Sequence, residues 1–208
     1  MKQILCFGDS NTYGLIPGTT NQRYGWGTRW TSILDDKVRT KGYRVIEEGL
    51  CGRTTVFDDP FRTERRGTEM LPAILESHRP VDTIVLMLGT NDCKSVYSAT
   101  PEVIGQGIEQ LLDQINTVNP DAKILLVSPI YLGERIWEED FIRNSIRILS
   151  KYHGICPGCM RKSPEEEIFL IFRLQNLPDR EKPIRSIWMN WDIADLQMQF
   201  MKSLQDEA

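Results

Sequence analysis

The feature that most constrains this chain is a set of short apolar runs, most of which end directly at glycine or small polar residues. Four such runs occur, at residues 3–7, 44–46, 83–88 and 123–127. Their length and apolar character are typical of strands buried in a parallel sheet. The chain is therefore expected to hold its strands in the interior and to cover them with helices.

Segments with helical spacing of apolar residues lie between and after these runs. They cover Thr28–Val38, Glu69–His78, Val103–Val118 and Trp137–Leu149. Strands that alternate with helices form βαβ units, with parallel strands and helices on both faces. A length of 208 residues suits one domain with a full core and is short for two. We predict a single α/β domain over residues 1–208.

Charge and composition exclude several classes of partner. The formal net charge is −4, so the chain has no excess of positive charge to neutralise phosphates, which argues against nucleic acid. The apolar run 3–7 is too short for a signal-peptide core or a membrane span. Five scattered cysteines suit reduced thiols better than a disulfide framework. We expect a cytoplasmic protein without membrane association.

The segments that follow the first three strands carry the candidate chemistry. They are Gly8–Gly14, Glu47–Thr55 and Gly89–Asp92. The carboxyl ends of parallel strands share one edge of the sheet, where ligands bind. Together these segments supply a hydroxyl, a glycine-rich loop with free N–H groups and a side-chain amide, which are the parts of an acyl-transfer site. Turn formation would explain any one segment alone, but three at the correct strand ends favour a site.

These segments resemble the first three sequence blocks of the SGNH (GDSL-type) serine hydrolases. Phe7–Asn11 is similar to the first block, and the resemblance implies that Ser10 is the nucleophile. Gly52 matches the second-block glycine and Asn91 the third-block asparagine. The resemblance implies that the N–H groups of Ser10 and Gly52 and the amide of Asn91 form the oxyanion hole. It also implies a flavodoxin-like, three-layer α/β/α fold with about five parallel strands.

Two further stretches are similar to the bacterial arylesterase branch of that family. They are Val45–Pro60 and the pair Arg29–Trp30, and the whole resemblance extends to about Ser150. It implies a serine esterase that acts through an acyl-enzyme on small acyl esters, acetyl and aryl esters among them. It further implies a small ester as the partner, self-association into a homo-oligomer, and no cofactor.

The resemblance fails at the fourth block, where the family supplies its catalytic Asp and His as Asp-x-x-His. This chain has no such block, and its two histidines are His78 and His153. Both follow helices that return toward the amino ends of the strands, the edge opposite Ser10. A general base must come within about 3 Å of the serine oxygen. The Asp and His of a triad are therefore not found in this chain as written.

Residues His153, Cys156 and Cys159 have a spacing that some metal sites share, and the two cysteines have that of a redox pair. No second cysteine pair follows them. We therefore predict no metal site.

The residues after about 151 are anomalous for the family, and their codons suggest a reason. Because Met and Trp each have one codon, the segment Trp188–Trp191 fixes much of its nucleotide sequence. In a shifted frame, the third base of each codon is read together with the first two bases of the following codon. In that frame the codons of residues 183–193 can encode Asp-Ser-Val-His-Leu-Asp-Glu-Leu-Gly-His. This contains the missing Asp-x-x-His. The hypothesis is that residues from somewhere between Ser150 and Cys159 onward are a frameshifted translation of the family's C-terminus; a divergent native tail is the alternative.

Three functions remain open. The first is a cytoplasmic SGNH esterase of small acyl esters. The second is a catalytically dead binding protein on the same fold, because the acid–base partners are absent. The third is a flavodoxin-like nucleotide or cofactor binder, although Asp9 would place negative charge where that class cradles a phosphate.

Overall fold

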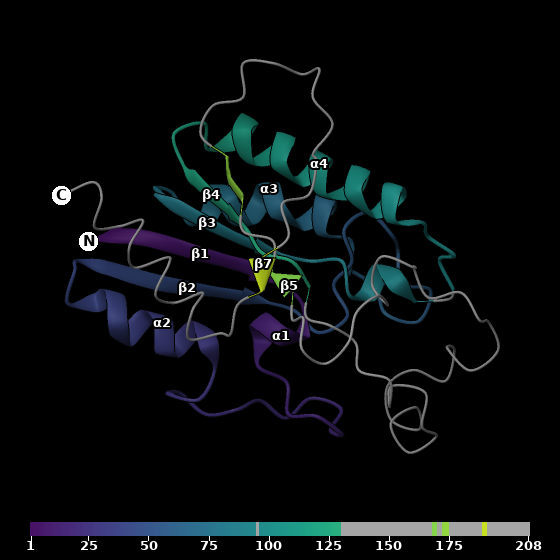
Figure 1. Ribbon diagram of the computed structural model, residues 1–208, viewed down its shortest axis with the longest axis horizontal. Helices are drawn as coiled ribbons and strands as arrows, with labels where there is room; N and C mark the ends of the chain where they lie inside the picture. Colours follow the sequence, from purple (N-terminus) through teal and green to yellow (C-terminus); the bar gives the residue numbers. More distant parts are fainter. Residues whose placement is uncertain (95, 130–167, 170–171, 175–188, 191–208) are drawn as a thin grey trace.

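The computed structural model describes residues 1–94, 96–129, 168–169, 172–174 and 189–190. Four parallel strands are hydrogen-bonded in the order β2-β1-β3-β4 (Figure 1). They are β1 (Lys2–Gly8), β2 (Tyr43–Gly49), β3 (Thr83–Met87) and β4 (Lys123–Leu126). The predicted parallel sheet is thereby confirmed, with each predicted strand within a few residues of its place.

Three short strands lie late in the chain. They are β5 (Ile168–Phe169), β6 (Phe172–Leu174) and β7 (Met189–Asn190). Strand β6 adds to the main sheet beside β4 and runs antiparallel to it, while β5 and β7 pair separately. Among the described residues the main sheet therefore has five strands, of which four are parallel and β6 is antiparallel.

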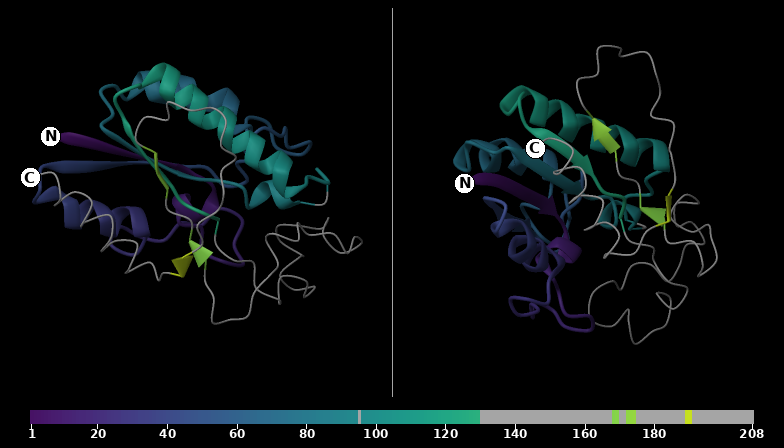
Figure 2. Two further views of the ribbon diagram at one scale, coloured as in Figure 1. Left: turned by 45° about the horizontal axis from the view of Figure 1, so that its top comes forward. Right: turned by 60° about the vertical axis from the view of Figure 1, so that its left-hand side comes forward.

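The helices cover both faces of the sheet, so the fold is the predicted three-layer α/β/α arrangement (Figures 1 and 2). They are α1 (Ser10–Tyr13), α2 (Trp30–Arg39), α3 (Gly67–Ser77) and α4 (Pro101–Val118), with a short 3₁₀ helix η1 (Asn91–Cys93). The predicted helix Trp137–Leu149 lies outside the described residues. Helix α1, which begins at Ser10, was not among the predicted helices.

Alternating side chains of the strands build two cores. Phe7 and Leu86 point to the face covered by α3 and α4, where they pack with buried residues such as Leu71 and Leu111. Cys6 and Val85, their neighbours in sequence, point to the other face and pack with Leu34 and other buried residues of α2. The period of two along each strand thus assigns every strand residue to one of two helical layers.

Two carboxylates, the buried Asp35 and the half-buried Glu47, attach helix α2 and its preceding loop to β2. Asp35 accepts a hydrogen bond from the Val45 backbone N–H at 2.7 Å. Glu47 accepts from Arg29 Nη2 at 2.8 Å and from Arg23 Nη2 at 2.9 Å. Burial alone would raise the pKa of Glu47, but hydrogen bonds from Arg29 and Thr31 outweigh it and lower the pKa. Arg29 belongs to the pair Arg29–Trp30 that resembles the arylesterase branch. Its contact with Glu47 gives it a structural role in this protein.

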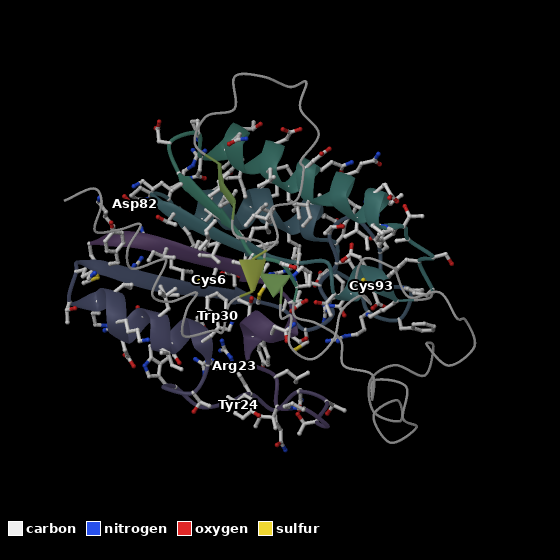
Figure 3. All side chains as sticks on the ribbon, viewed as in Figure 1. Cys6, Arg23, Tyr24, Trp30, Asp82 and Cys93 are labelled. Carbon is white, nitrogen blue, oxygen red and sulfur yellow. The ribbon has the colours of Figure 1, made fainter. Side chains whose placement is uncertain are left out.

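The two ends of the sheet have different roles. At the amino end, Asp82 accepts a hydrogen bond from the Gln3 backbone N–H at 2.8 Å. Cys93 lies beyond the carboxyl ends, on the opposite side of the molecule from Asp82 (Figure 3). The three candidate segments follow the carboxyl ends of β1, β2 and β3. Among the described residues, no helix combines the length and the apolar character needed to cross a membrane.

Candidate active site

Ser10 is the first residue of helix α1, directly beyond the carboxyl end of β1. Asp9 caps this helix: its Oδ1 accepts from the Asn11 backbone N–H at 2.9 Å and from Asn11 Nδ2 at 3.0 Å. The helix ends at Gly14, whose φ of 78° is in the left-handed region that favours glycine. Ser10 itself is half-buried. The serine is therefore held on a short, capped turn with part of its surface accessible.

Close packing between the end of β1 and this turn requires Gly8. A Cβ on Gly8 would lie 2.0 Å from Thr12 Oγ1 and 2.9 Å from the Met87 carbonyl oxygen. Any side chain at this position would push α1 away from β3. The glycine before Asp9 therefore sets how closely Ser10 approaches the neighbouring strand.

The loop after β2 brings Gly52 to the same end of the sheet. Gly52 has a φ of 87°, and the Leu50 backbone N–H donates to the Gly8 carbonyl at 3.1 Å. A Cβ on Gly49 would lie 2.1 Å from the backbone nitrogen of Tyr13, so α1 packs directly on the end of β2 that leads into this loop. The first two candidate segments are therefore in backbone contact.

Arg53 links the carboxyl ends of β1 and β2 through hydrogen bonds of its side chain. Its Nη1 donates to the Gly8 carbonyl at 2.9 Å and also to the Glu48 carbonyl. The guanidinium lies over the Phe7 ring, 4.0 Å from the ring centroid, and the residue is 2% exposed. Burial lowers the pKa of Arg53 to about 10, which still leaves the side chain charged at neutral pH. Arg53 therefore fixes the relative position of the two strand ends.

Asn91 connects the third segment to the second. It begins η1, and its Nδ2 donates to the Arg53 carbonyl at 3.0 Å. This bond fixes one amide hydrogen and leaves the second available to a ligand. Through Arg53, hydrogen bonds link Asn91 to the end of β1 that leads into Ser10. The structure thus brings the segments of Ser10, Gly52 and Asn91 together, as their strand positions predicted.

Asp92 forms a second link between the same two segments. It is fully buried, and its Oδ1 accepts from the Thr55 backbone N–H at 2.9 Å and from the Thr55 hydroxyl. Burial raises the pKa of Asp92, although the bonds from Thr55 oppose the rise. The Asp92–Thr55 contact therefore holds Asn91 and the Gly52 loop in a fixed relation.

Asp9 is the other buried carboxyl group of the site. It is 1% exposed, and burial raises its pKa to about 6, against opposing hydrogen bonds that include those from Asn11. This carboxyl group therefore titrates at about pH 6 and is mostly ionised at pH 7. It sits one residue before Ser10, with its Oδ1 directed at the turn itself.

His78 directly follows helix α3, and its ring is paired with a glutamate side chain. The helix starts at Gly67, whose N–H donates to the Thr54 carbonyl near the site, and runs back toward the start of β3. His78 Nε2 lies 2.8 Å from Glu48 Oε1. His153, Cys156 and Cys159 lie outside the described residues. Within the part of the chain that the structure describes, no cluster of three or more metal-ligating side chains occurs.

Arg53 and Asp92 were not predicted as site residues from the sequence. Each stands beside a predicted oxyanion donor, Arg53 after Gly52 and Asp92 after Asn91. A charged residue inside an otherwise small and polar turn was the available signal. Charged side chains are rarely fully buried without a specific partner, so their burial here marks a structural role in shaping the site.

Comparison with known proteins gives a family and a set of structural relatives. The model of the GDSL-like lipase/acylhydrolase family matches residues 6–152. A carbohydrate acetylesterase from Sinorhizobium meliloti is 36% identical, covers 71% of this chain and 74% of its own, and superposes with a TM-score of 0.61. The native aryl esterase of M. smegmatis is 35% identical, with coverages of 72% and 75% and a TM-score of 0.60. No curated protein matches the sequence.

Proposed function

This chain belongs to the GDSL-like lipase/acylhydrolase family, whose members hydrolyse esters, and we propose that it does so through an acyl-enzyme on Ser10. The observation that carries the proposal is the hydrogen-bond path from Asn91 Nδ2 to the Arg53 carbonyl and from Arg53 Nη1 to the Gly8 carbonyl. This path supports the proposal because it links the segments of the serine turn, the Gly52 loop and Asn91 by hydrogen bonds. A nucleophile with converging N–H donors suits acyl transfer.

In the proposed reaction, Ser10 Oγ attacks the ester carbonyl carbon. The negative charge that develops on the carbonyl oxygen is stabilised by the N–H groups of Ser10 and Gly52 and the free N–H of Asn91. Collapse of the tetrahedral intermediate releases the alcohol and leaves the acyl group on Ser10, and water then hydrolyses that ester. One oxyanion donor of this kind contributes about 3–4 kcal/mol of transition-state stabilisation.

The substrates we propose are small acyl esters, with acetyl esters first. The named relatives are a carbohydrate acetylesterase and an aryl esterase. An acetyl group is common to simple substrates of both kinds, so 4-nitrophenyl acetate is a suitable first probe.

The proton transfers require a histidine, and His78, the histidine among the described residues, is paired with Glu48. We propose that the family's Asp-x-x-His is encoded in the shifted frame across residues 183–187 and that translation leaves the family frame between Ser150 and Cys159. The end of the family match at residue 152 supports this proposal. Sequencing the coding DNA across the codons for Ser150 to Ser186 tests it. A frame unable to encode Asp-x-x-His-Leu there would exclude the proposal.

The absence of Asp-x-x-His from the 208 residues favours a second candidate for this exact chain, a binding protein without turnover. Hydrolysis of 4-nitrophenyl acetate by the chain and by its frame-restored form separates the two. The esterase proposal expects the restored form to be active, Ser10→Ala to abolish that activity without unfolding the protein, and the 208-residue chain to be slower by several powers of ten. A restored form with no Ser10-dependent turnover would favour the binding protein.

A further inference from the structure

Two arginine side chains lie against the Gly52 loop. Arg62 Nη1 is 3.1 Å, and Arg65 Cδ 3.6 Å, from the position that a Cβ on Gly52 would take. Because the backbone N and Cβ of any residue are about 2.5 Å apart, Arg62 Nη1 lies within about 5.6 Å of the Gly52 nitrogen. A positive charge therefore stands next to the proposed oxyanion donor.

Arg65 is held in place by carbonyl groups of the same region. Its Nε donates to the Cys51 carbonyl at 2.9 Å and its Nη1 to the Thr63 carbonyl at 2.7 Å. No described residue accepts from its Nη2. Burial, and after it the charge of Arg62, lowers the pKa of Arg65. The two guanidinium groups are thus close enough to repel each other, and one of them is fixed beside the loop.

The acidic residues of this segment do not neutralise the pair. Asp58 forms an ion pair with Arg66, and Asp59 forms one with Lys94 at 3.0 Å. Glu64 is exposed, and within the part of the chain that is described it forms no ion pair. Asp59 and, more weakly, Glu64 act on Arg65 as charges at longer range. Arg62 and Arg65 likewise have no carboxylate partner among the described residues. Two like charges at the edge of a site form a local field that attracts an anion.

We propose that Arg62 and Arg65 bind a carboxylate group carried by the ester substrate, so that the site prefers anionic esters to neutral ones. The inference rests on the esterase function proposed above and narrows its substrate class. A guanidinium group matches a carboxylate in shape and charge, and two together hold it firmly. Their distance from the Gly52 nitrogen places such a carboxylate a few atoms from the carbonyl that reacts.

Equilibrium binding to the 208-residue chain tests the preference without requiring turnover. The probes are O-acetylglycolate, with its carboxylate on the alcohol side, monoethyl succinate, with its carboxylate on the acyl side, and the neutral O-acetylglycolamide. Titrations followed by NMR at low salt should show at least one anionic ester binding about tenfold tighter than the neutral one, as expected for a hydrogen-bonded charged group. Added salt should reduce the difference.

Arg62→Gln is the deciding variant, because Arg62 is exposed and its replacement should not disturb folding. It should abolish most of the preference, and Arg65→Gln should do the same. Arg66→Gln is the matched control, since Arg66 lies in the same segment but is already paired with Asp58; it should keep the preference. Equal affinity for anionic and neutral esters, no binding of any probe, or a preference that survives Arg62→Gln would overturn the inference.

Failure of this inference and failure of the esterase function can be told apart. If the frame-restored protein hydrolyses neutral 4-nitrophenyl acetate but shows no carboxylate preference, only the anion site is wrong. If the chain binds anionic esters in an Arg62-dependent manner but its restored form hydrolyses none, the anion site stands and the esterase proposal is wrong.

Discussion

Replacing Asp9 by asparagine should make the folded protein more stable above about pH 6. The Asp9 carboxyl group is almost fully buried, and burial raises its pKa from 3.8 to about 6. Both hydrogen bonds from Asn11 end on Oδ1. An asparagine can keep that oxygen in place and present its NH₂ group where Oδ2 stood. The variant therefore removes the buried charge without removing the helix cap.

The size of the effect follows from the pKa shift. A carboxyl group with a raised pKa in the folded state favours folding while it holds its proton, so this stability is present below pH 3.8 and is lost as the pH rises through 6. The shift of about two units corresponds to about 3 kcal/mol of unfolding free energy. The asparagine variant does not titrate, so it should exceed the parent by up to that amount at pH 7.

Urea denaturation between pH 4 and pH 8 measures the difference directly. The gap between Asp9→Asn and the parent should widen as the pH rises from 4 to 7. Asp9→Ala should be less stable than Asp9→Asn by about 1 kcal/mol, because it also loses the cap. Asp36→Asn, which removes an exposed carboxylate from α2, controls for the change in net charge. A gap between Asp9→Asn and the parent that stays constant over this pH range would refute the reasoning.

Three further predictions follow from the site. In the frame-restored protein, Asn91→Ala should lower kcat by about a hundredfold or more with little change in KM, since its amide acts on developing charge; steady-state kinetics with 4-nitrophenyl acetate measures this, and a change confined to KM would contradict it. Asp92→Ala should lower the unfolding free energy by about 2 kcal/mol, because the Thr55 N–H and hydroxyl lose their buried acceptor; an unchanged urea midpoint would argue against this link. Gly52→Ala should cost about 1–2 kcal/mol, because its φ of 87° disfavours any Cβ and Arg62 Nη1 fills that space; thermal melting is the measurement, and a melting temperature equal to that of the parent would contradict it.

The sequence alone determined the architecture of the described region and indicated where its candidate site lies. Apolar runs and helical spacing are local patterns, and they predicted all four parallel strands and helices α2, α3 and α4 within a few residues. The rule that ligands bind beyond the carboxyl ends of parallel strands then placed three segments at one edge. Helix α1 was missed because four residues are too few to show a helical period.

Tertiary structure decided which side chains hold that site together. Arg53 reaches the Gly8 carbonyl across 45 residues of sequence, and Asp92 reaches Thr55 across 37. The register of the parallel strands creates these contacts, and no local pattern encodes a register between segments so far apart. The closeness of Arg62 to Gly52 likewise depends on how the loop after β2 folds back on itself. The sequence therefore specified the candidate groups of the proposed chemistry through local motifs, whereas only the packed chain specified the charges around them, because burial and long-range pairing exist only after folding.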